Sequence, residues 1–280
     1  MAMPRDLVLV RHGQSEANIV QKAEEESRTI EVPELFYERH DWAYRLTPNG
    51  VEQAKRAGRW IVENIGEPAE VFDRAYVSPF VRARETAAHL GGPACKWLVD
   101  ERLKERDWGI YGATPKEERE RIFPMTERMR QQSYFYTRFD NGESIADVFM
   151  RARDLLATFH RDTSDKSVIA VTHGDTMGAF RSLIEHMLPE EWEDMDKDIS
   201  QSVRNCTIIW YSRANPENHD DVRDHVSWRR IIRTDDESAS PHGGEWVELA
   251  GRRKFTGTDL LETVEAFPHI FPEDTVTKPH

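Results

Sequence analysis

Residues 7–13, Leu7-Val8-Leu9-Val10-Arg11-His12-Gly13, carry the strongest structural signal in the chain. Four consecutive apolar residues are typical of a short strand that is buried on both faces, as in a parallel sheet. Val168-Ile169-Ala170-Val171 repeats this pattern and runs into Thr172-His173-Gly174. A third run, Ala75-Tyr76-Val77, leads into Ser78-Pro79. The three runs predict strands of one sheet, and two of them end in a His-Gly pair.

Helices are predicted between these strands. Thr47-Pro48 and Ser78-Pro79 each combine an N-cap residue with a proline in the first turn, and they favour helices that end near residues 65 and 90. Further helices are predicted from Thr114-Pro115 with Glu117 completing a capping box, from Ser144 with Asp147 to about residue 161, from His173 to about residue 187, and over residues 256–264. Because strands and helices alternate, the fold class is α/β. Ligands of such sheets bind at the carboxyl ends of the strands, where both His-Gly pairs lie.

The second half of the chain adds strands and an irregular end. Residues 94–99 are predicted as an edge strand, residues 206–211 and 226–234 as a pair at the sheet edge, and residues 213–224 as a polar loop. No repeat or linker divides the chain, so we expect a catalytic domain over residues 1–235. Residues 236–280 are predicted to be a partly irregular C-terminal extension.

The composition excludes several functional classes. The 280 residues carry 38 basic and 51 acidic side chains, a formal net charge of −13, which disfavours nucleic acid and anionic membranes as partners. No apolar run has the length of a membrane span, and the N-terminus does not resemble a secretory signal. Cys95 and Cys206 are too few for a disulfide framework. We therefore expect a cytoplasmic protein with a reduced pair of core cysteines.

Four cationic or titratable side chains are predicted to meet at the carboxyl edge of the sheet: Arg11, His12, His173 and Arg82. A guanidinium presents a rigid fork that matches two phosphate oxygens. Gly13 and Gly174 allow backbone N–H groups to approach an anion closely, and a helix N-terminus follows His173. This combination in an acidic chain indicates a site for a phosphoryl group.

A histidine at such a site also indicates covalent chemistry. A neutral imidazole attacks phosphorus when one ring nitrogen holds its proton against a carbonyl and the other is free. The leaving alkoxide then needs a proton from a general acid, and a carboxyl group near the phosphate is suited to that task. Four carboxylates after the strand at 94–99 are candidates: Asp100, Glu101, Glu105 and Asp107.

Four ordered motifs resemble those of the histidine phosphatase superfamily, the phosphoglycerate-mutase-like proteins. They are Arg11-His12-Gly13-Gln14-Ser15-Glu16-Ala17-Asn18, Ser78-Pro79-Phe80-Val81-Arg82-Ala83-Arg84-Glu85-Thr86-Ala87, Leu103-Lys104-Glu105-Arg106-Asp107-Trp108-Gly109 and Thr172-His173-Gly174. Residues 139–144 are similar to the stretch that often precedes the long helix of this family. The resemblance covers about residues 5–212. It implies a three-layer α/β/α sandwich with a mostly parallel central sheet and a cap insertion at about residues 112–141.

The resemblance also implies roles for individual residues. His12 is expected to be the nucleophile, and Glu105 the proton donor and later the base that activates water. Arg11, Arg82 and His173 are expected to bind the phosphoryl group and take part in catalysis. Asn18 and Gly174 are expected as further substrate contacts. No metal ion and no other cofactor are expected, because the arginines supply the positive charge.

Each assignment has a structural alternative. Arg82 and Arg84 point to different faces of one helix, so only one of them can face the site. Glu105 can instead be a surface carboxylate paired with Lys104 or Arg106, and Asn18 can simply end a turn. The cap contains five arginines that either contact substrate or are solvated: Arg119, Arg121, Arg128, Arg130 and Arg138.

The sequence favours a phosphatase over a mutase. Glycolytic mutases typically continue the acid motif with an Arg-His-Tyr-Gly-like stretch and a basic insertion, whereas this chain has Arg106-Asp107-Trp108-Gly109. The helix after the last motif also begins with Asp175, whose carboxylate is unfavourable beside the second anionic group of a mutase substrate. We predict a metal-independent hydrolase of small phosphorylated metabolites that acts through a phosphohistidine on His12. The alternatives are a cofactor-dependent mutase-type phosphotransferase and a non-catalytic module that binds a phosphorylated ligand.

Overall fold

Parallel strands carry the predicted motifs to one edge of a central sheet. The computed structural model describes residues 2–265 and 267–271. Strand β1 (Asp6–Arg11) lies beside β4 (Ser167–Thr172), and Arg11 is in register with Thr172. Two further parallel strands extend the sheet on the β4 side, β2 (Arg74–Val77) and then β3 (Trp97–Val99). His12 and His173 therefore follow neighbouring strands at the same level.

Antiparallel strands complete the other half of the sheet. They are β5 (Thr207–Ser212), β8 (Trp228–Arg233) and β9 (Val247–Glu248), and the strand order is β3-β2-β4-β1-β5-β8-β9. The predicted pairing of β5 with β8 is confirmed, but their predicted place at the edge is wrong, because β5 lies next to β1 and β9 covers β8. The predicted polar loop at 213–224 instead contains a hairpin, β6 (Ala214–Asn215) and β7 (Asn218–Val222). All of β7 is exposed, so no apolar alternation marks it in the sequence.

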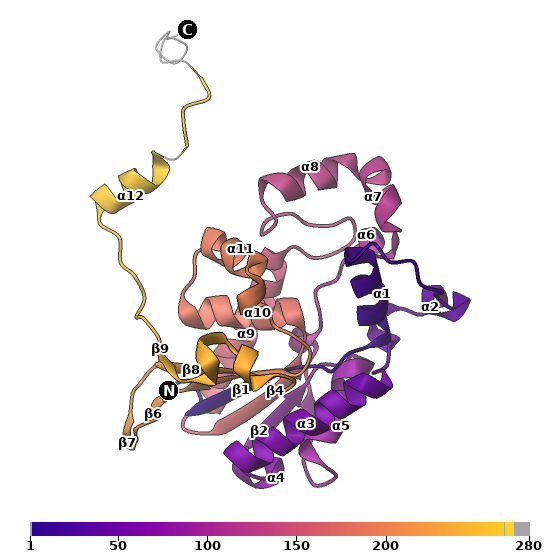
Figure 1. The fold of residues 1–280 in the computed structure, drawn as a ribbon. Coiled ribbons are helices and arrows are strands. Elements are labelled where there is room, and N and C mark those ends of the chain that lie inside the picture. Colours follow the sequence, from indigo (N-terminus) through magenta and orange to yellow (C-terminus); the bar gives the residue numbers. More distant parts are fainter. Residues whose placement is uncertain (1, 266, 272–280) are drawn as a thin grey trace. The chain divides into compact units, whose positions relative to one another are not determined.

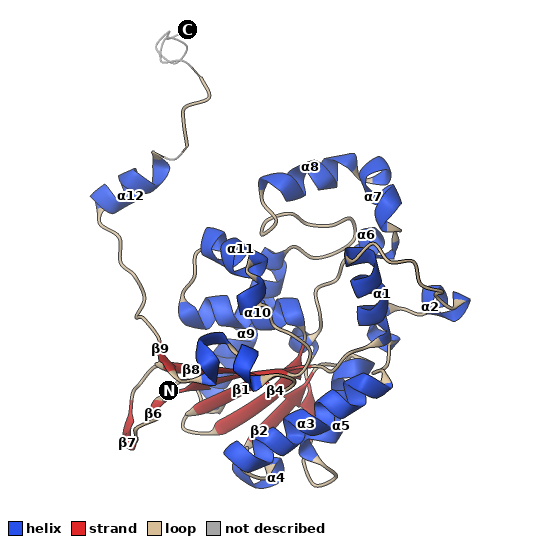
Figure 2. Ribbon diagram, in the orientation of Figure 1, coloured by secondary structure: helices blue, strands red, loops and turns tan. Residues whose placement is uncertain are grey.

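Alternate residues of the central strands supply two hydrophobic cores. Val8 and Val10 of β1 pack toward α3 (Pro48–Asn64) and α5 (Val81–Gly91). Leu7 and Leu9 pack in the other core, with α9 (Ile145–Asp162) and α10 (Gly174–Glu185). Helices thus cover both faces of the sheet (Figure 2), and the predicted three-layer α/β/α architecture with a mostly parallel sheet is confirmed.

Capping interactions explain where several helices begin. Thr47 Oγ1 accepts from the backbone N–H of Gly50 at the start of α3, and Ser144 forms a reciprocal capping box with Asp147 at the start of α9. The capping box predicted for Thr114 is wrong, because its hydroxyl donates to the carbonyl of Ile110 and α7 (Lys116–Ile122) begins after Pro115. Helix α5 begins three residues later than Ser78, whose hydroxyl is bonded to His173.

Short helices from two parts of the chain surround the carboxyl edge of the sheet (Figure 1). One group precedes α3 and comprises α1 (Glu16–Glu25), α2 (Glu34–Glu38) and the 3-10 turn η1 (Asp41–Ala43). The other includes α6 (Gly109–Ala113), α7 and α8 (Pro124–Gln132). Two other short helices lie elsewhere in residues 1–250: α4 (Pro68–Val71) and α11 (Pro189–Lys197).

The chain divides into two compact units, residues 1–250 and residues 251–280. The second contains α12 (Gly257–Val264), which agrees with the helix predicted over residues 256–264. Residues 272–280, which belong to the predicted C-terminal extension, lie outside the described residues. No helix in the described part of the chain combines the length and the apolar character that crossing a membrane requires.

Candidate active site

His12 and His173 meet at the carboxyl ends of β1 and β4. Their ring centroids are 4.9 Å apart, and the ring planes are inclined at 62° in an edge-to-face arrangement. The backbone N–H of His12 donates to the carbonyl of Thr172 at 3.0 Å, which continues the parallel ladder by one residue. Both side chains are buried. The structure therefore brings together the two imidazoles that lie 161 positions apart in the sequence.

The hydrogen bonds of His12 define the roles of its two ring nitrogens. Nδ1 lies 2.7 Å from the carbonyl oxygen of Gly13, so it carries the proton and donates. Nε2 carries no proton and accepts from the Nε–H of Arg82 at 3.3 Å, so the lone pair of Nε2 points toward the guanidinium. Burial, followed by the charges of Arg82 and Arg11, holds the pKa of His12 well below its ordinary value. The neutral, potentially nucleophilic form is thereby favoured.

Gly13 is required for this arrangement by a close backbone contact. A Cβ atom at position 13 would lie 2.4 Å from the carbonyl oxygen of Gly50 in α3. The backbone N–H of Gly13 donates to Thr86 Oγ1, and that hydroxyl donates to the carbonyl of Arg82. The loop that holds His12 is thus tied to the same helix as Arg82.

Arg82 is the arginine of α5 that faces the site, whereas Arg84 is exposed, as the spacing predicts. Its guanidinium bridges His12 to Asp41 of η1. Nη1 donates to the backbone carbonyl of Asp41 at 2.6 Å and to Oδ1 at 3.3 Å, and Nη2 donates to Oδ2 at 3.1 Å. Asp41 was not predicted from the sequence.

Two buried nitrogen atoms near the imidazoles have no hydrogen-bond partner within the described residues: the donor Nε of Arg11 and the ring nitrogen Nδ1 of His173. Nη1 of Arg11 donates to the carbonyl of Val203 at 2.5 Å, and Nε2 of His173 lies 2.7 Å from Ser78 Oγ. Burial, with a smaller contribution from Arg82, lowers the pKa of His173 well below its ordinary value. Unpartnered buried nitrogen atoms beside two guanidiniums suit an anion-binding site.

Glu105 lies beside this group and is fixed by two backbone donors. Oε1 accepts from the N–H of Arg106 and Oε2 from the N–H of Gly174, both at 3.0 Å. The N–H of Gly174, which we expected near the anion, is therefore engaged with Glu105. Burial and, second, the nearby Asp175 carboxylate raise the pKa of Glu105 to about 7. A carboxyl group with this pKa can both donate and accept a proton at neutral pH.

The other carboxylates proposed as acids lack these features. Asp100 pairs with Arg102 at 2.7 Å, which lowers the pKa of Asp100. Glu101 is exposed, and Asp107 Oδ1 accepts from the N–H of Gly109. Glu105 is also not paired with Lys104, whose ammonium lies 3.9 Å from Glu143.

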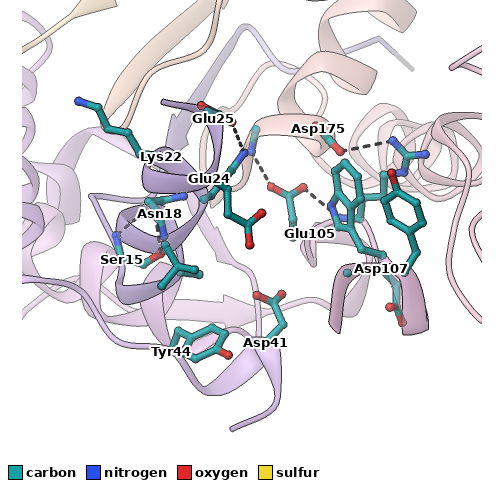
Figure 3. Close-up of a pocket in the computed structure, with 18 of the residues that line it drawn as sticks. Ser15, Asn18, Lys22, Glu24, Glu25, Asp41, Tyr44, Glu105, Asp107 and Asp175 are labelled. Atoms are coloured by element: carbon teal, nitrogen blue, oxygen red, sulfur yellow. Dashed lines mark hydrogen bonds and ion pairs between the residues drawn. The ribbon is translucent and has the colours of Figure 1, made fainter. Parts of the chain in front are cut away.

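Asn18 lines the same pocket but has a structural task as well (Figure 3). It forms the capping box of α1 with Ser15, and its Oδ1 also accepts from Asn205 Nδ2 at 3.1 Å. Asn205 donates in addition to the carbonyl of His12 at 3.1 Å. The amide oxygen of Asn18 is therefore occupied, and its Nδ2 is the group that remains for a ligand.

Three further residues at the site were given no role there from the sequence: Ser78, Asn205 and Arg106. The guanidinium of Arg106 is buried among the rings of Trp108, Tyr134 and Phe139, and its Nη1 lies 3.9 Å from Asp175 Oδ2. Ser78 and Arg106 had a signal, because both lie within the motifs quoted above, and Asp175 was expected beside the substrate. Asn205 had none, since it reaches the site from the loop before β5.

Of the five cap arginines, Arg119 and Arg130 line the pocket. Arg119 lies 3.6 Å from Glu24 and over the ring of Tyr111, and Arg130 pairs with Glu127 at 2.9 Å. Arg121 and Arg138 pair with Glu118 and Asp147, and Arg128 is exposed. Both pocket-lining arginines are thus already engaged by carboxylates.

Comparison with known proteins agrees with this geometry. A family model described as the histidine phosphatase superfamily (branch 1) matches residues 7–219. The chain is 26% identical to the phosphoglycerate mutase-like protein AT74 of Arabidopsis thaliana, over 88% of this chain and 79% of the relative. It is 31% identical to a 2,3-bisphosphoglycerate-dependent phosphoglycerate mutase of Bartonella bacilliformis, over 68% of this chain and 85% of the relative.

Solved structures share the fold. A mycobacterial glucosyl-3-phosphoglycerate phosphatase superposes with a TM-score of 0.56 at 21% identity, over 79% of this chain and 96% of that chain. A phosphoserine phosphatase from Entamoeba histolytica, solved in complex with 3-phosphoglyceric acid, gives a TM-score of 0.55 at 23% identity, over 76% and 92% of the two chains. On the extent of the family match, together with the relatives, the chain belongs to the histidine phosphatase superfamily.

Proposed function

We propose that the protein hydrolyses phosphate monoesters of small metabolites through a phosphohistidine on His12, without a metal ion. The observation that carries this proposal is the state of the His12 ring. Its Nδ1–H is held by the carbonyl of Gly13, its Nε2 faces Arg82, and its pKa is lowered by burial. The ring is therefore neutral and oriented for attack through Nε2.

In the first step, Nε2 of His12 attacks the phosphorus atom and the bond from phosphorus to the alcohol oxygen breaks. Glu105 in its protonated form gives its proton to that oxygen, so that an alcohol leaves. The raised pKa of Glu105 supports this role. The products of the step are phosphohistidine, the alcohol and the carboxylate of Glu105.

In the second step, a water molecule attacks the phosphorus atom and the phosphorus–nitrogen bond breaks. The Glu105 carboxylate takes a proton from the water, which restores the acid for the next turnover. Inorganic phosphate leaves and neutral His12 is regenerated. One residue thus acts as acid and then as base, as microscopic reversibility allows.

The phosphoryl oxygens are held by Arg11, Arg82, His173 and the amide of Asn18 in this proposal. Support comes from the unpartnered nitrogen atoms Nε of Arg11 and Nδ1 of His173 within the described residues. Fixed cations beside the equatorial oxygens stabilise the charge that spreads over them during transfer. Gly174 contributes by holding Glu105 through its N–H rather than by a bond to phosphate.

Mutase activity is the second candidate, because named mutases are among the relatives. Hydrolysis is favoured by the acidic lining of the pocket beyond the phosphoryl group. Asp107 and Asp175 lie there, and the lining arginines Arg119 and Arg130 are paired with carboxylates. A second negatively charged group on the substrate would meet these carboxylates, and neither of the two cap arginines is free to neutralise it.

The test compares wild-type protein with His12→Ala on para-nitrophenyl phosphate, in buffer without added metal ion. We expect turnover and a trapped phosphoenzyme for the wild type only. Phosphate binding without His12-dependent turnover on a panel of phosphomonoesters would instead identify a binding module. Incubation with 3-phosphoglycerate and 2,3-bisphosphoglycerate distinguishes a phosphatase from a mutase. Formation of 2-phosphoglycerate faster than free phosphate identifies a mutase.

A further inference from the structure

The guanidinium fork of Arg82, meaning its two Nη groups, is bonded to an aspartate of the same chain. Within residues 2–265 and 267–271, Asp41 is the residue that accepts from both Nη atoms, through its backbone oxygen and both carboxylate oxygens. Nε of the same guanidinium donates to Nε2 of His12. The two Nη groups belong to the guanidinium whose Nε bonds the reacting nitrogen, so a phosphoryl group bound at Nε2 of His12 lies within reach of them. Asp41 and the substrate therefore compete for one fork.

Asp41 rather than Arg82 is the partner that can move. The arginine side chain is 5% exposed and fixed on α5, whereas the Asp41 side chain is 48% exposed. Every one of residues 24–43, all of them described, is half-buried or exposed. Tyr44 anchors the end of this segment, because its ring stacks on Phe36 and its hydroxyl donates to the carbonyl of Phe36. Two ion pairs add to this, with Arg39 at 3.5 Å from Glu16 and Arg119 at 3.6 Å from Glu24. Few buried contacts oppose a shift of η1 away from the fork.

A displaced Asp41 carboxylate stays at the mouth of the pocket. Figure 3 shows Asp41 and Glu24 pointing into the same space as Glu105, the residue next to which the alcohol leaves. Glu24 is paired with Arg119, so the positive charge of that arginine is already offset. A leaving group that carries its own carboxylate would meet Asp41 at short range, where like charges repel.

We propose that Asp41 is a specificity-determining residue: it competes with the phosphoryl group for Arg82 and, once displaced, selects against phosphate esters with an anionic leaving group. The inference rests on the proposed function. It names phosphate esters with an uncharged leaving group, such as those of polyols, as the preferred substrate class.

The first experiment measures inorganic phosphate binding by titration calorimetry, which needs no turnover. Asp41→Asn removes the competing charge, and we expect it to bind phosphate about three- to tenfold more tightly, because a larger share of the protein has a free fork. Glu38→Gln is the matched control. Glu38 also lines the pocket and lies three residues earlier, but it is Asp41 that accepts from the two Nη groups of Arg82, so removing the Glu38 charge should leave phosphate affinity within about twofold.

The second experiment compares kcat/KM for glycerol 3-phosphate and for 3-phosphoglycerate, which differ in the charge of the leaving group. The wild type should prefer glycerol 3-phosphate, whose leaving group is uncharged, and Asp41→Asn should reduce this preference about three- to tenfold while Glu38→Gln does not. Asp41→Ala serves as a second variant with the same expectation.

The outcomes separate the two proposals. Weaker or unchanged phosphate binding by Asp41→Asn would mean that Asp41 positions Arg82 instead of competing for it, and would overturn the inference. A wild-type preference for 3-phosphoglycerate, or an unchanged preference in both Asp41 variants, would also overturn it. Loss of the proposed function shows itself differently, as an absence of His12-dependent hydrolysis of either ester, and the phosphate titration still decides the competition.

Discussion

Glu105 is held so that either protonation state keeps its position. Its two oxygens accept from the backbone N–H groups of Arg106 and Gly174, and those bonds do not depend on a flexible partner. Glu105→Gln keeps the size of the side chain but cannot transfer a proton. We expect turnover of an alkyl phosphate to fall by about 10²–10⁴, and that of para-nitrophenyl phosphate to fall far less, because nitrophenolate leaves without protonation. Equal losses on both substrates in steady-state assays would remove Glu105 from the donor role.

Asp175 raises the pKa of Glu105 from a neighbouring position, with burial as the larger cause and with Arg82 and Arg11 opposing. Since hydrolysis begins with protonated Glu105, kcat/KM should fall as the pH rises through about 7. Asp175→Asn removes a negative charge, which lowers the pKa of Glu105 and should shift this alkaline limb to lower pH. The acid limb, set by protonation of His12, should stay well below pH 6.5.

The pH profile of kcat/KM reports groups of the free enzyme, so it is the measurement of choice. Glu101→Gln is the control, because this exposed carboxylate also lines the pocket and is not among the main causes of the Glu105 shift. An alkaline limb that moves equally in both variants would show a general effect of surface charge instead of a specific one.

Residue identity was predictable where a side chain directly follows a buried strand. His12 and His173 fall at the ends of apolar runs whose pairing places them together, and Arg82 lies five residues after Val77, the end of another such run. Asp41 and Asn205 were not predictable, because they reach the site from loops. The course of those loops depends on tertiary contacts such as the stacking of Phe36 on Tyr44.

At the level of elements, a capping box in the sequence predicted the start of one helix correctly and the start of another wrongly. Ser144 begins an 18-residue helix that buries Val148, Leu155 and Phe159, so capping and packing favour the same start. Thr114 precedes a 7-residue helix with no buried residue. With no packing to reward that start, the Thr114 hydroxyl instead bonds the preceding helix at Ile110. A capping sequence therefore predicts a boundary best where an apolar face follows it.

The last residue of α10 joins that helix to the antiparallel half of the sheet. Glu185 accepts from Arg181 at 3.1 Å, from the hydroxyl of Tyr211 at 2.7 Å and from Arg229. All four side chains are buried or nearly so. Glu185→Ala leaves two buried guanidiniums without their carboxylate, and we expect the free energy of unfolding to fall by about 3–5 kcal/mol.

Urea denaturation measures this loss, with Glu190→Ala as the control. Glu190 is an exposed residue of α11, and its removal should change stability by no more than about 0.5 kcal/mol. A loss below about 1 kcal/mol for Glu185→Ala would show that the buried arginines find other partners and that the ion cluster does not hold α10 to β5 and β8.

Across the whole molecule, strand order was the least predictable feature. The apolar runs identified β1, β2 and β4 and their parallel direction, because each is buried on both faces. The insertion of β5 beside β1 has no counterpart in local sequence, since an antiparallel strand in the middle of a sheet and one at its edge can carry similar residues. Its place follows from the packing of Ile209 and Tyr211 with α9 and α10.

The net charge of −13 repels an anionic substrate as it approaches the protein. Arg11 and Arg82 lie deep in the site, whereas exposed or half-buried carboxylates such as Glu24, Glu25 and Asp107 line the pocket (Figure 3). A phosphate dianion therefore meets a repulsive field before it meets the guanidiniums. The Debye length falls from about 30 Å at 0.01 M salt to about 8 Å at 0.15 M, so added salt screens the distant repulsion more than the contact with Arg82.

We accordingly expect kcat/KM for para-nitrophenyl phosphate to rise about two- to fivefold between about 0.01 and 0.15 M sodium chloride, with little change in kcat. Stopped-flow or initial-rate measurements at substrate concentrations far below and far above KM give kcat/KM and kcat separately. Inhibition by the chloride ion at Arg82 would act in the opposite direction, and potassium gluconate in place of sodium chloride distinguishes that effect. If kcat/KM falls with gluconate as well, the field at the pocket mouth attracts anions, and the buried guanidiniums outweigh the acidic surface at long range.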